Sequence, residues 1–263
     1  MVTLAAIFPP SQPPERLGAV AAAAESAGLE QLWIWEDCFM ESGIATATAM
    51  LATTSRITVG IGLLPVPLRN VALTAMEIAT LSRLFPGRLI AGVGHGVLDW
   101  MGQAGARVES PMTLLREYTA ALYALLHGET VTTRGRYVNL DAVALDWPPA
   151  VVPPLLVGGI KPRTVSLAGE LADGVIIPGG VSPEEVRASV GQLHGQRSAG
   201  RGPADVVVFT TTPAGRPAAA VAATVSEYAA AGATHVAVNA AEDDADLERF
   251  AGFLAREVGP LLR

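Results

Sequence analysis

Asp37 and His95 are the residues whose type and position best suit proton transfer. Asp37 follows the apolar run LWIWE at 32–36, where its carboxylate could bind the ring edge or a hydroxyl of a ligand, or cap the following helix. His95 ends another apolar run and stands between two glycines. Because imidazole changes its charge near neutral pH, His95 could exchange a proton with a substrate.

Two glycine clusters are candidates for binding a phosphate group. The sequence VGGIK at 157–161 ends an apolar run and opens a helix, so its amides and the helix N-terminus could receive a phosphate beside the lysine. An ordinary tight turn is the alternative. Gly94 lies in GVGHG at 92–96, but Val97 stands where a full G-x-G-x-x-G requires glycine. The candidate phosphate-binding residues are Gly158, Gly159, Ile160 and Lys161.

Other kinds of catalytic centre find no support in the sequence. No pair of carboxylates follows different apolar runs, no set of His, Asp and Glu has metal-ligand spacing, and no G-x-S-x-G motif occurs. We therefore predict no metal site. A site so poor in acids, bases and metal ligands indicates that a bound organic cofactor supplies the chemistry.

Eight apolar runs, each followed by a helical pattern, would position these residues. The runs are nearly continuous in Val, Ile and Leu, which is typical of a parallel sheet covered by helices. Eight such units close most economically into one (β/α)8 TIM barrel, and an open doubly wound sheet is the alternative. In a barrel, chemistry belongs to residues at the C-terminal ends of the strands. The runs begin near Val2, Gln31, Ile57, Arg88, Pro154, Gly174, Asp205 and His235.

The spacing of these runs predicts an insertion. They begin about 20 to 31 residues apart, except for about 66 residues between the fourth and the fifth. We predict an insertion after the fourth strand, at about 97–153, with a helix at 112–126 and a hairpin turn at 134–136. It would lie at the C-terminal mouth, either covering a substrate or as a peripheral decoration. No linker marks a second domain, so we expect residues 1–263 to form one.

The composition narrows the partners and the compartment. With 50% hydrophobic and 16% charged residues, the 263-residue chain can bury a large core. A net charge of -7 without a basic cluster argues against nucleic acid as a partner. The single cysteine, Cys38, fits a reducing compartment, and the first apolar run is too short for a signal peptide or a membrane span. We expect a cytoplasmic protein that binds neither nucleic acid nor a membrane.

Two long blocks of the chain carry a family resemblance. The first, at 57–96, reads ITVGIGLLPVPLRNVALTAMEIATLSRLFPGRLIAGVGHG, and the second, at 157–177, reads VGGIKPRTVSLAGELADGVII. They resemble the third strand to the fourth strand, and the phosphate turn to the sixth strand, of the luciferase-like monooxygenase superfamily. The chain is most similar to its branch of F420-dependent (deazaflavin) oxidoreductases. The resemblance implies a flavin-type ring, F420 or FMN, lying across the barrel mouth.

The resemblance also implies roles for individual residues. In such barrels a bulge after the third strand, often with a non-prolyl cis peptide, backs the central face of the ring, and it maps to Gly62 and Leu63. The acid after the second strand maps to Asp37, near the polar edge or a hydroxyl of the ring. The other implied cofactor contacts are Gly94 at the mouth, Gly158, Gly159, Ile160 and Lys161 at the phosphate turn, and Ile177 as a wall contact.

Two positions depart from the family pattern, and both concern proton transfer. Cys38 stands where deazaflavin members often have a histidine, and Val97 stands where the sugar-phosphate dehydrogenase branch has a glutamate. Without those groups we do not expect oxidation of a sugar alcohol by general base catalysis, whereas hydride transfer to or from an apolar substrate needs neither. Arg69 and Asn70 are candidate contacts for the tail of the cofactor.

The sequence therefore predicts an F420-dependent oxidoreductase that transfers a hydride between the deazaflavin and a small, largely apolar organic substrate. One alternative is an FMN-dependent luciferase-like monooxygenase that uses O2. A second alternative is a barrel that binds a flavin or another ligand without catalysis. A separate reductase could supply reduced cofactor, and the resemblance implies a homodimer.

Overall fold

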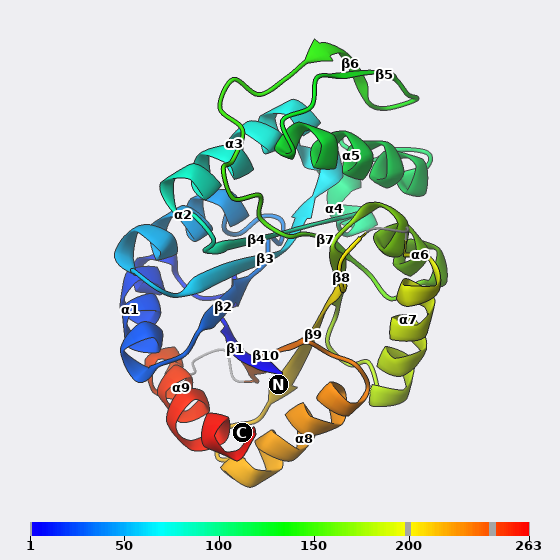
Figure 1. Cartoon of the computed structure of the whole chain (residues 1–263). Helices are drawn as coiled ribbons and strands as arrows, with labels where there is room; N and C mark the ends of the chain where they lie inside the picture. Colours follow the sequence, from blue (N-terminus) through cyan, green and yellow to red (C-terminus); the bar gives the residue numbers. More distant parts are fainter. Residues whose placement is uncertain (1, 198–200, 242–245, 263) are drawn as a thin grey trace.

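The eight apolar runs form a closed parallel barrel with the strand order β1-β10-β9-β8-β7-β4-β3-β2. The computed structural model (Figure 1) describes residues 2–197, 201–241 and 246–262. Each strand begins within one residue of its predicted start, so the (β/α)8 barrel is confirmed and the open sheet is excluded. The strands are β1 Thr3–Ile7, β2 Gln31–Ile34, β3 Thr58–Pro65, β4 Leu89–Gly94, β7 Leu155–Gly158, β8 Gly174–Ile177, β9 Asp205–Thr212 and β10 His235–Ala240.

Helices surround the barrel and begin and end at residues with local reasons to do so (Figure 1). Ser182 and Glu185 form a capping box at the start of α7, and Gly28 ends α1 in a left-handed conformation. None of the helices in the described ranges is long and apolar enough to cross a bilayer. The helices are α1 Leu17–Ala27, α2 Gly43–Thr53, α3 Val71–Leu84, α4 Leu98–Gln103, α5 Pro111–Leu126, α6 Pro162–Leu171, α7 Pro183–Gly195, α8 Ala218–Ala230 and α9 Leu247–Phe253, with short turns η1 Pro14–Arg16, η2 Val66–Leu68, η3 Leu254–Val258 and η4 Gly259–Leu262.

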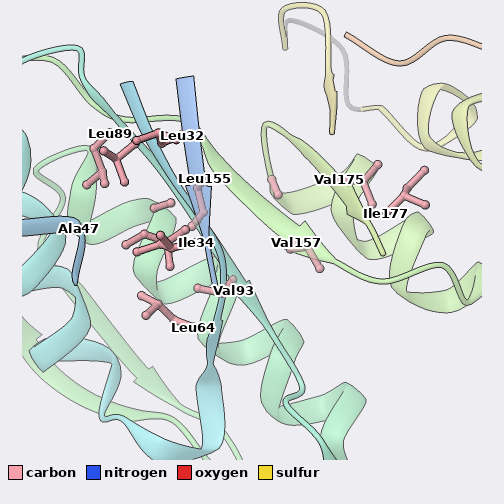
Figure 2. Packing of buried hydrophobic residues seen from close by; sticks show 14 of the residues in the cluster. Leu32, Ile34, Ala47, Leu64, Leu89, Val93, Leu155, Val157, Val175 and Ile177 are labelled. Carbon is pink, nitrogen blue, oxygen red and sulfur yellow. The ribbon is translucent and has the colours of Figure 1, made fainter. Parts of the chain in front are cut away.

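Side chains alternate between two cores because successive strand residues point to opposite faces of the sheet. Figure 2 shows outward-facing residues such as Ile34, Leu64 and Val157, which pack in the layer between strands and helices. A smaller core fills the barrel interior. Its buried members are Ala5, Ile7, Trp33, Ile90, Leu156, Ile176, Val207, Phe209 and Ala237. The interior is thus packed below the mouth, so a ligand has room only at the strand ends.

The segment 97–153 divides into a barrel helix and additional elements. The predicted helix forms as α5, but it packs between α3 and α6 and takes the ring position that follows β4 (Figure 1). The additional elements are α4 and the antiparallel hairpin of β5 Val131–Arg134 and β6 Asn139–Val143. Glu117 of α5 accepts hydrogen bonds from the amides of residues 136–138 and so holds the hairpin turn. Of these elements, α4 lies nearest the mouth, since Val97 and Trp100 border the cavity there.

Candidate functional site

A cavity of about 450 Å³ opens at the C-terminal ends of the barrel strands. Six neighbouring strands, β2, β3, β4, β7, β8 and β9, contribute residues near or just beyond their C-terminal ends, as the fold predicts for a site in a parallel barrel. The lining residues are Trp35, Glu36, Asp37, Gly62, Leu63, Pro65, His95, Gly96, Val97, Trp100, Gly158, Gly159, Ile176, Pro178 and Phe209. Most of this surface is apolar, which suits an organic ring better than a polar metabolite.

The Gly62–Leu63 peptide bond is cis, at the position that the resemblance implied. The pairing of β3 with β4 shifts register between Ile61 and Leu64, so the chain bulges here as well. Glycines on the next two strands make room for Leu63. A Cβ at Gly94 would lie 2.4 Å from Leu63 Cδ2, and one at Gly158 would lie 2.2 Å from the same atom. Gly94 and Gly158 therefore have a packing role in placing Leu63 at the mouth.

Asp37 borders the cavity, where Trp35 holds its carboxylate. The indole nitrogen Nε1 of Trp35 donates a hydrogen bond of 2.7 Å to Oδ2 of Asp37. Burial raises the pKa of Asp37 above its ordinary value, and the hydrogen bond from Trp35 partly opposes that shift. In the described part of the chain, Oδ1 of Asp37 has no hydrogen-bond partner, so it can accept one from a ligand.

Glu36, next to Asp37, has both carboxylate oxygens engaged. Arg69 donates through Nη1 to Oε1 and, at 2.8 Å, through Nη2 to Oε2 of Glu36. The amide of Gly43 donates a further bond of 2.7 Å to Oε2. Nε of Arg69 lies 3.4 Å from Oε2 of Glu77. Arg69 is thus committed to two carboxylates, whereas the sequence suggested it as a contact for the cofactor tail. Asn70, the other suggested tail contact, caps α3 by accepting from the Ala72 amide.

His95 borders the cavity from the end of β4. Burial lowers the pKa of His95 below its ordinary value, and an interaction with the backbone of Pro111 partly opposes this. Its Nδ1 atom is buried without a hydrogen-bond partner in the structure. Because this nitrogen is buried, it is not open to a ligand in the cavity, and the proton-transfer role suggested by the sequence stays a prediction.

The predicted phosphate turn is only partly in the cavity. Gly158 and Gly159 line it, and the amide of Gly159 already donates to the carbonyl of Ile176. Ile160 packs against the outer core, and Lys161 is exposed at the start of α6. No side chain caps that helix, but Pro162 has no N–H and the amide of Thr164 donates to the carbonyl of Lys161. Among the described residues of the first turn, this leaves the amide of Arg163 for an anion.

Ile177 does not face the cavity. Its side chain is fully buried in the outer core, as Figure 2 shows, while that of Ile176 points into the mouth. The alternation of the strand therefore gives the wall position to Ile176. Sequence reasoning missed three aromatic wall residues, Trp35, Trp100 and Phe209. The period of two along β9 was the available signal for Phe209, because it places that ring on the same face as Val207.

The two departures from the family pattern occupy different places. Val97 borders the cavity and is 46% exposed, so this part of the mouth carries an alkyl group. Cys38 forms a second cis peptide with Phe39 and does not line the cavity. Burial raises the pKa of the Cys38 thiol, and the charges of Glu36 and Asp37 raise it further. Among the described residues, no group of His, Cys, Asp and Glu side chains is arranged to hold a metal ion.

This cavity is better suited to binding a flat conjugated ring than to acid–base catalysis by its own side chains. Leu63 and the walls of Trp35, Trp100 and Phe209 offer apolar contacts, and Asp37 offers an unpartnered carboxylate oxygen. Such a combination, mostly apolar with a few polar atoms that fix orientation, is typical of cofactor sites. The side chains present would bind and orient a ring and exclude water, whereas electrons would have to come from the bound group.

The chain belongs to the luciferase-like monooxygenase family, whose pattern it matches over residues 2–258. Among curated proteins, it is 32% identical to a 5,10-methylenetetrahydromethanopterin reductase of Methanolobus tindarius, over 76% of this chain and 61% of the relative. It is 31% identical to an F420-dependent glucose-6-phosphate dehydrogenase of Nakamurella multipartita, over 65% of this chain and 54% of the relative. The chain thus spans less than two thirds of the length of these relatives.

Solved structures agree on the fold. An F420-dependent tetrahydromethanopterin reductase from Methanopyrus kandleri superposes with a TM-score of 0.84 at 20% identity, covering 100% of this chain and 99% of that one. An F420-dependent secondary alcohol dehydrogenase superposes with a TM-score of 0.86 at 16% identity, covering 100% of both chains. The FMN-containing oxygenating constituent of 3,6-diketocamphane monooxygenase from Pseudomonas putida gives 0.83 at 15% identity, covering 100% of this chain and 99% of that one. At these identities the likeness establishes the barrel alone.

Proposed function

We propose that this chain is an F420-dependent oxidoreductase that transfers a hydride between the deazaflavin and a small, largely apolar organic substrate. The observation that carries the proposal is the cavity at the mouth, where Leu63 lies with Asp37 and apolar walls. The printed F420 dependence of the glucose-6-phosphate dehydrogenase matched by sequence supports F420 as the cofactor. The FMN-dependent monooxygenase and the non-catalytic barrel have less support from the relatives matched by sequence.

Each part of the site has a separate task in this proposal. When bound, F420 supplies the hydride-transfer chemistry that the side chains lack. Leu63 would support the ring, and Asp37 would accept a hydrogen bond from its polar edge. Gly158, Gly159 and the N-terminus of α6 would hold the phosphate group. His95, which borders the cavity, would exchange the proton that accompanies reduction or oxidation of the substrate.

The walls of the cavity favour an apolar substrate. Val97, Trp100 and Phe209 present no hydrogen-bonding group except the indole N–H of the tryptophan. Glu36 borders the cavity, but its oxygens are occupied by Arg69 and Gly43. A polyhydroxylated sugar would leave several hydroxyls unpaired against these walls, at a cost of about 1–3 kcal/mol for each buried group.

Equilibrium titration of the purified protein with F420 and, separately, with FMN tests the cofactor. Trp35 and Trp100 border the cavity, whereas Trp147 is 70% exposed and lies outside it, so quenching of intrinsic fluorescence reports ring binding. We expect F420 to bind at least tenfold more tightly than FMN, a difference of about 1.4 kcal/mol. Replacing Trp100 by Phe should reduce the quenching amplitude, and the matched Trp147→Phe change should leave the quenched signal intact.

Other outcomes of the titration select other functions. Tighter binding of FMN, with consumption of O2 by the reduced complex, would identify a flavin monooxygenase instead. Binding of either cofactor without turnover of any alkene, imine or carbonyl substrate would favour the non-catalytic barrel. Binding of neither cofactor would refute the proposal, although the fold would stand.

The proposal also includes two partners, a second copy of the chain and a separate reductase. The homodimer implied by the resemblance is consistent with α3, which exposes the side chains of Leu73, Met76 and Leu84. Light scattering after size-exclusion chromatography measures the mass of the assembly directly. A separate reductase for the cofactor would be needed only if the organic substrate is the electron acceptor. Measuring whether turnover depends on such a reductase tests this.

A further inference from the structure

Glu36, the acidic residue beside Asp37, connects four segments of the mouth. The amide of Glu36 donates to the carbonyl of Leu63 at 3.3 Å, which ties the end of β2 to the cis turn. Its carboxylate accepts from the amide of Gly43 at 2.7 Å, at the start of α2. The same carboxylate receives two bonds from Arg69, which precedes α3. The loop that carries Asp37 is therefore fixed at both ends by Glu36.

The contact between Arg69 and Glu36 is sheltered and has the geometry of a strong pair. The side chains are 15% and 8% exposed, and the two guanidinium nitrogens engage the two carboxylate oxygens in a fork. Such bidentate pairs fix orientation as well as charge, and solvent screens them less than exposed pairs. Glu77 lies on the other side of the guanidinium, 3.4 Å from its Nε, and limits rotation of Arg69.

We propose that Arg69 is a positioning residue of the cofactor site, which acts through Glu36 to hold the Asp37 loop against the Gly62–Leu63 turn. Arg69 does not line the mouth cavity, so it need not touch the cofactor or the substrate. The effect of Arg69 on cofactor binding rests on the proposed function. Immobilisation of the Asp37 loop by the Arg69–Glu36 pair does not, and it can be measured without any cofactor.

The test uses Arg69→Met, Arg69→Lys, Glu36→Gln and the Arg69→Met/Glu36→Gln double variant. The matched control is Arg116→Met, because Arg116 and Glu170 form a second fork, with both contacts at 2.7 Å, between α5 and α6 on the outside of the barrel. That pair is 49% and 44% exposed, and its residues do not line the mouth. Thermal unfolding of each variant verifies that the proteins compared are folded.

Hydrogen exchange at the Gly43 amide, followed by NMR, is the readout that needs no cofactor. We expect Arg69→Met to speed this exchange at least tenfold, Arg69→Lys to give an intermediate value, and Arg116→Met to leave it unchanged. Lysine keeps the charge but cannot form the fork, so partial rescue is the expected signature of positioning. Exchange at Gly43 within twofold of the wild-type rate in folded Arg69→Met would overturn the proposal.

Binding of F420 is the second readout. We expect Arg69→Met and Glu36→Gln each to weaken it about tenfold, equivalent to about 1.4 kcal/mol, and the double variant to lose little more, because both changes break one pair. Losses that add in the double variant would show that Arg69 does not act through Glu36. If the wild-type protein binds no F420 while Gly43 still responds to Arg69→Met, the proposed cofactor fails and the positioning of the loop stands.

Discussion

Asp37 illustrates a conflict between stability and function at a single residue. Burial raises its pKa above the ordinary value of 3.8, which means that the folded protein holds the proton more tightly than the unfolded chain. Stability is therefore lost as the pH rises from 3.8 through the folded pKa, and the ionised carboxylate destabilises the protein at neutral pH. An enzyme would retain such a group because its unpartnered oxygen binds a ligand.

The Asp37→Asn change should therefore raise the melting temperature at pH 7 while weakening F420 binding about tenfold. The amide oxygen can still accept from Trp35, so the local geometry has a reason to persist. The gain in melting temperature should vanish as the pH falls below the ordinary aspartate pKa of 3.8, where the wild-type carboxyl is neutral as well. Calorimetry across this pH range and the fluorescence titration measure the two effects.

Asp146→Asn is a suitable control for that prediction, because Asp146 is exposed outside the mouth. It should change neither the melting temperature nor the binding of F420. Equal gains in melting temperature for both variants would mean that net charge, rather than burial at the mouth, controls the stability.

At the scale of elements, the bulge at Gly62–Leu63, which lies within β3, depends on space left by the neighbouring strands β4 and β7. A Cβ on Gly158 would come within 2.2 Å of Leu63, closer than real atoms approach. We expect Gly158→Ala to destabilise the protein by about 1–3 kcal/mol, as overpacked sites do. In a Leu63→Ala background the same change should cost much less, so a double-mutant cycle by urea unfolding should give a large coupling energy.

Gly191 in α7 provides the contrasting glycine. A Cβ there would meet nothing within 4 Å, so Gly191→Ala should stabilise the protein by about 0.5–1 kcal/mol through helix propensity. If Gly158→Ala costs as much without Leu63 as with it, Gly158 is required for its backbone and not to accommodate that side chain.

The sequence predicted elements far better than it predicted contacts between them. Strand starts follow from local apolar runs, so β7 and β8 were placed within one residue. The fork between Glu36 and Arg69 joins residues 33 positions apart, and no local pattern announces it. The role of α5 as a barrel helix likewise depends on its packing against α3 and α6. Ile177 was exchanged with Ile176 because a family motif marks a position in the chain but not which neighbour faces inward.

At the scale of the whole molecule, the two ends of the barrel have different tasks. The mouth holds the candidate site, and the opposite end contains contacts that join elements. Glu25 of α1 is the clearest of these, since it accepts bonds from the amides of Ser55, Arg56 and Ile57 just before β3 begins. Burial alone would raise the pKa of Glu25, but these hydrogen bonds lower it from 4.5 to about 2.

This separation predicts opposite phenotypes for the two ends. The folded pKa of Glu25 lies below its ordinary value, so its contribution to stability is present above pH 4.5 and is lost as the pH falls toward 2. Glu25→Gln should cost about 1 kcal/mol at pH 7, less than is usual for hydrogen bonds to a charged group because solvent screens this carboxylate. The variant should flatten the stability profile between pH 4.5 and 2 while leaving F420 binding at pH 7 within twofold of wild type. Weaker binding in this variant would show that the two ends are coupled, and would place part of the control of the mouth in the contact of α1 with the segment before β3.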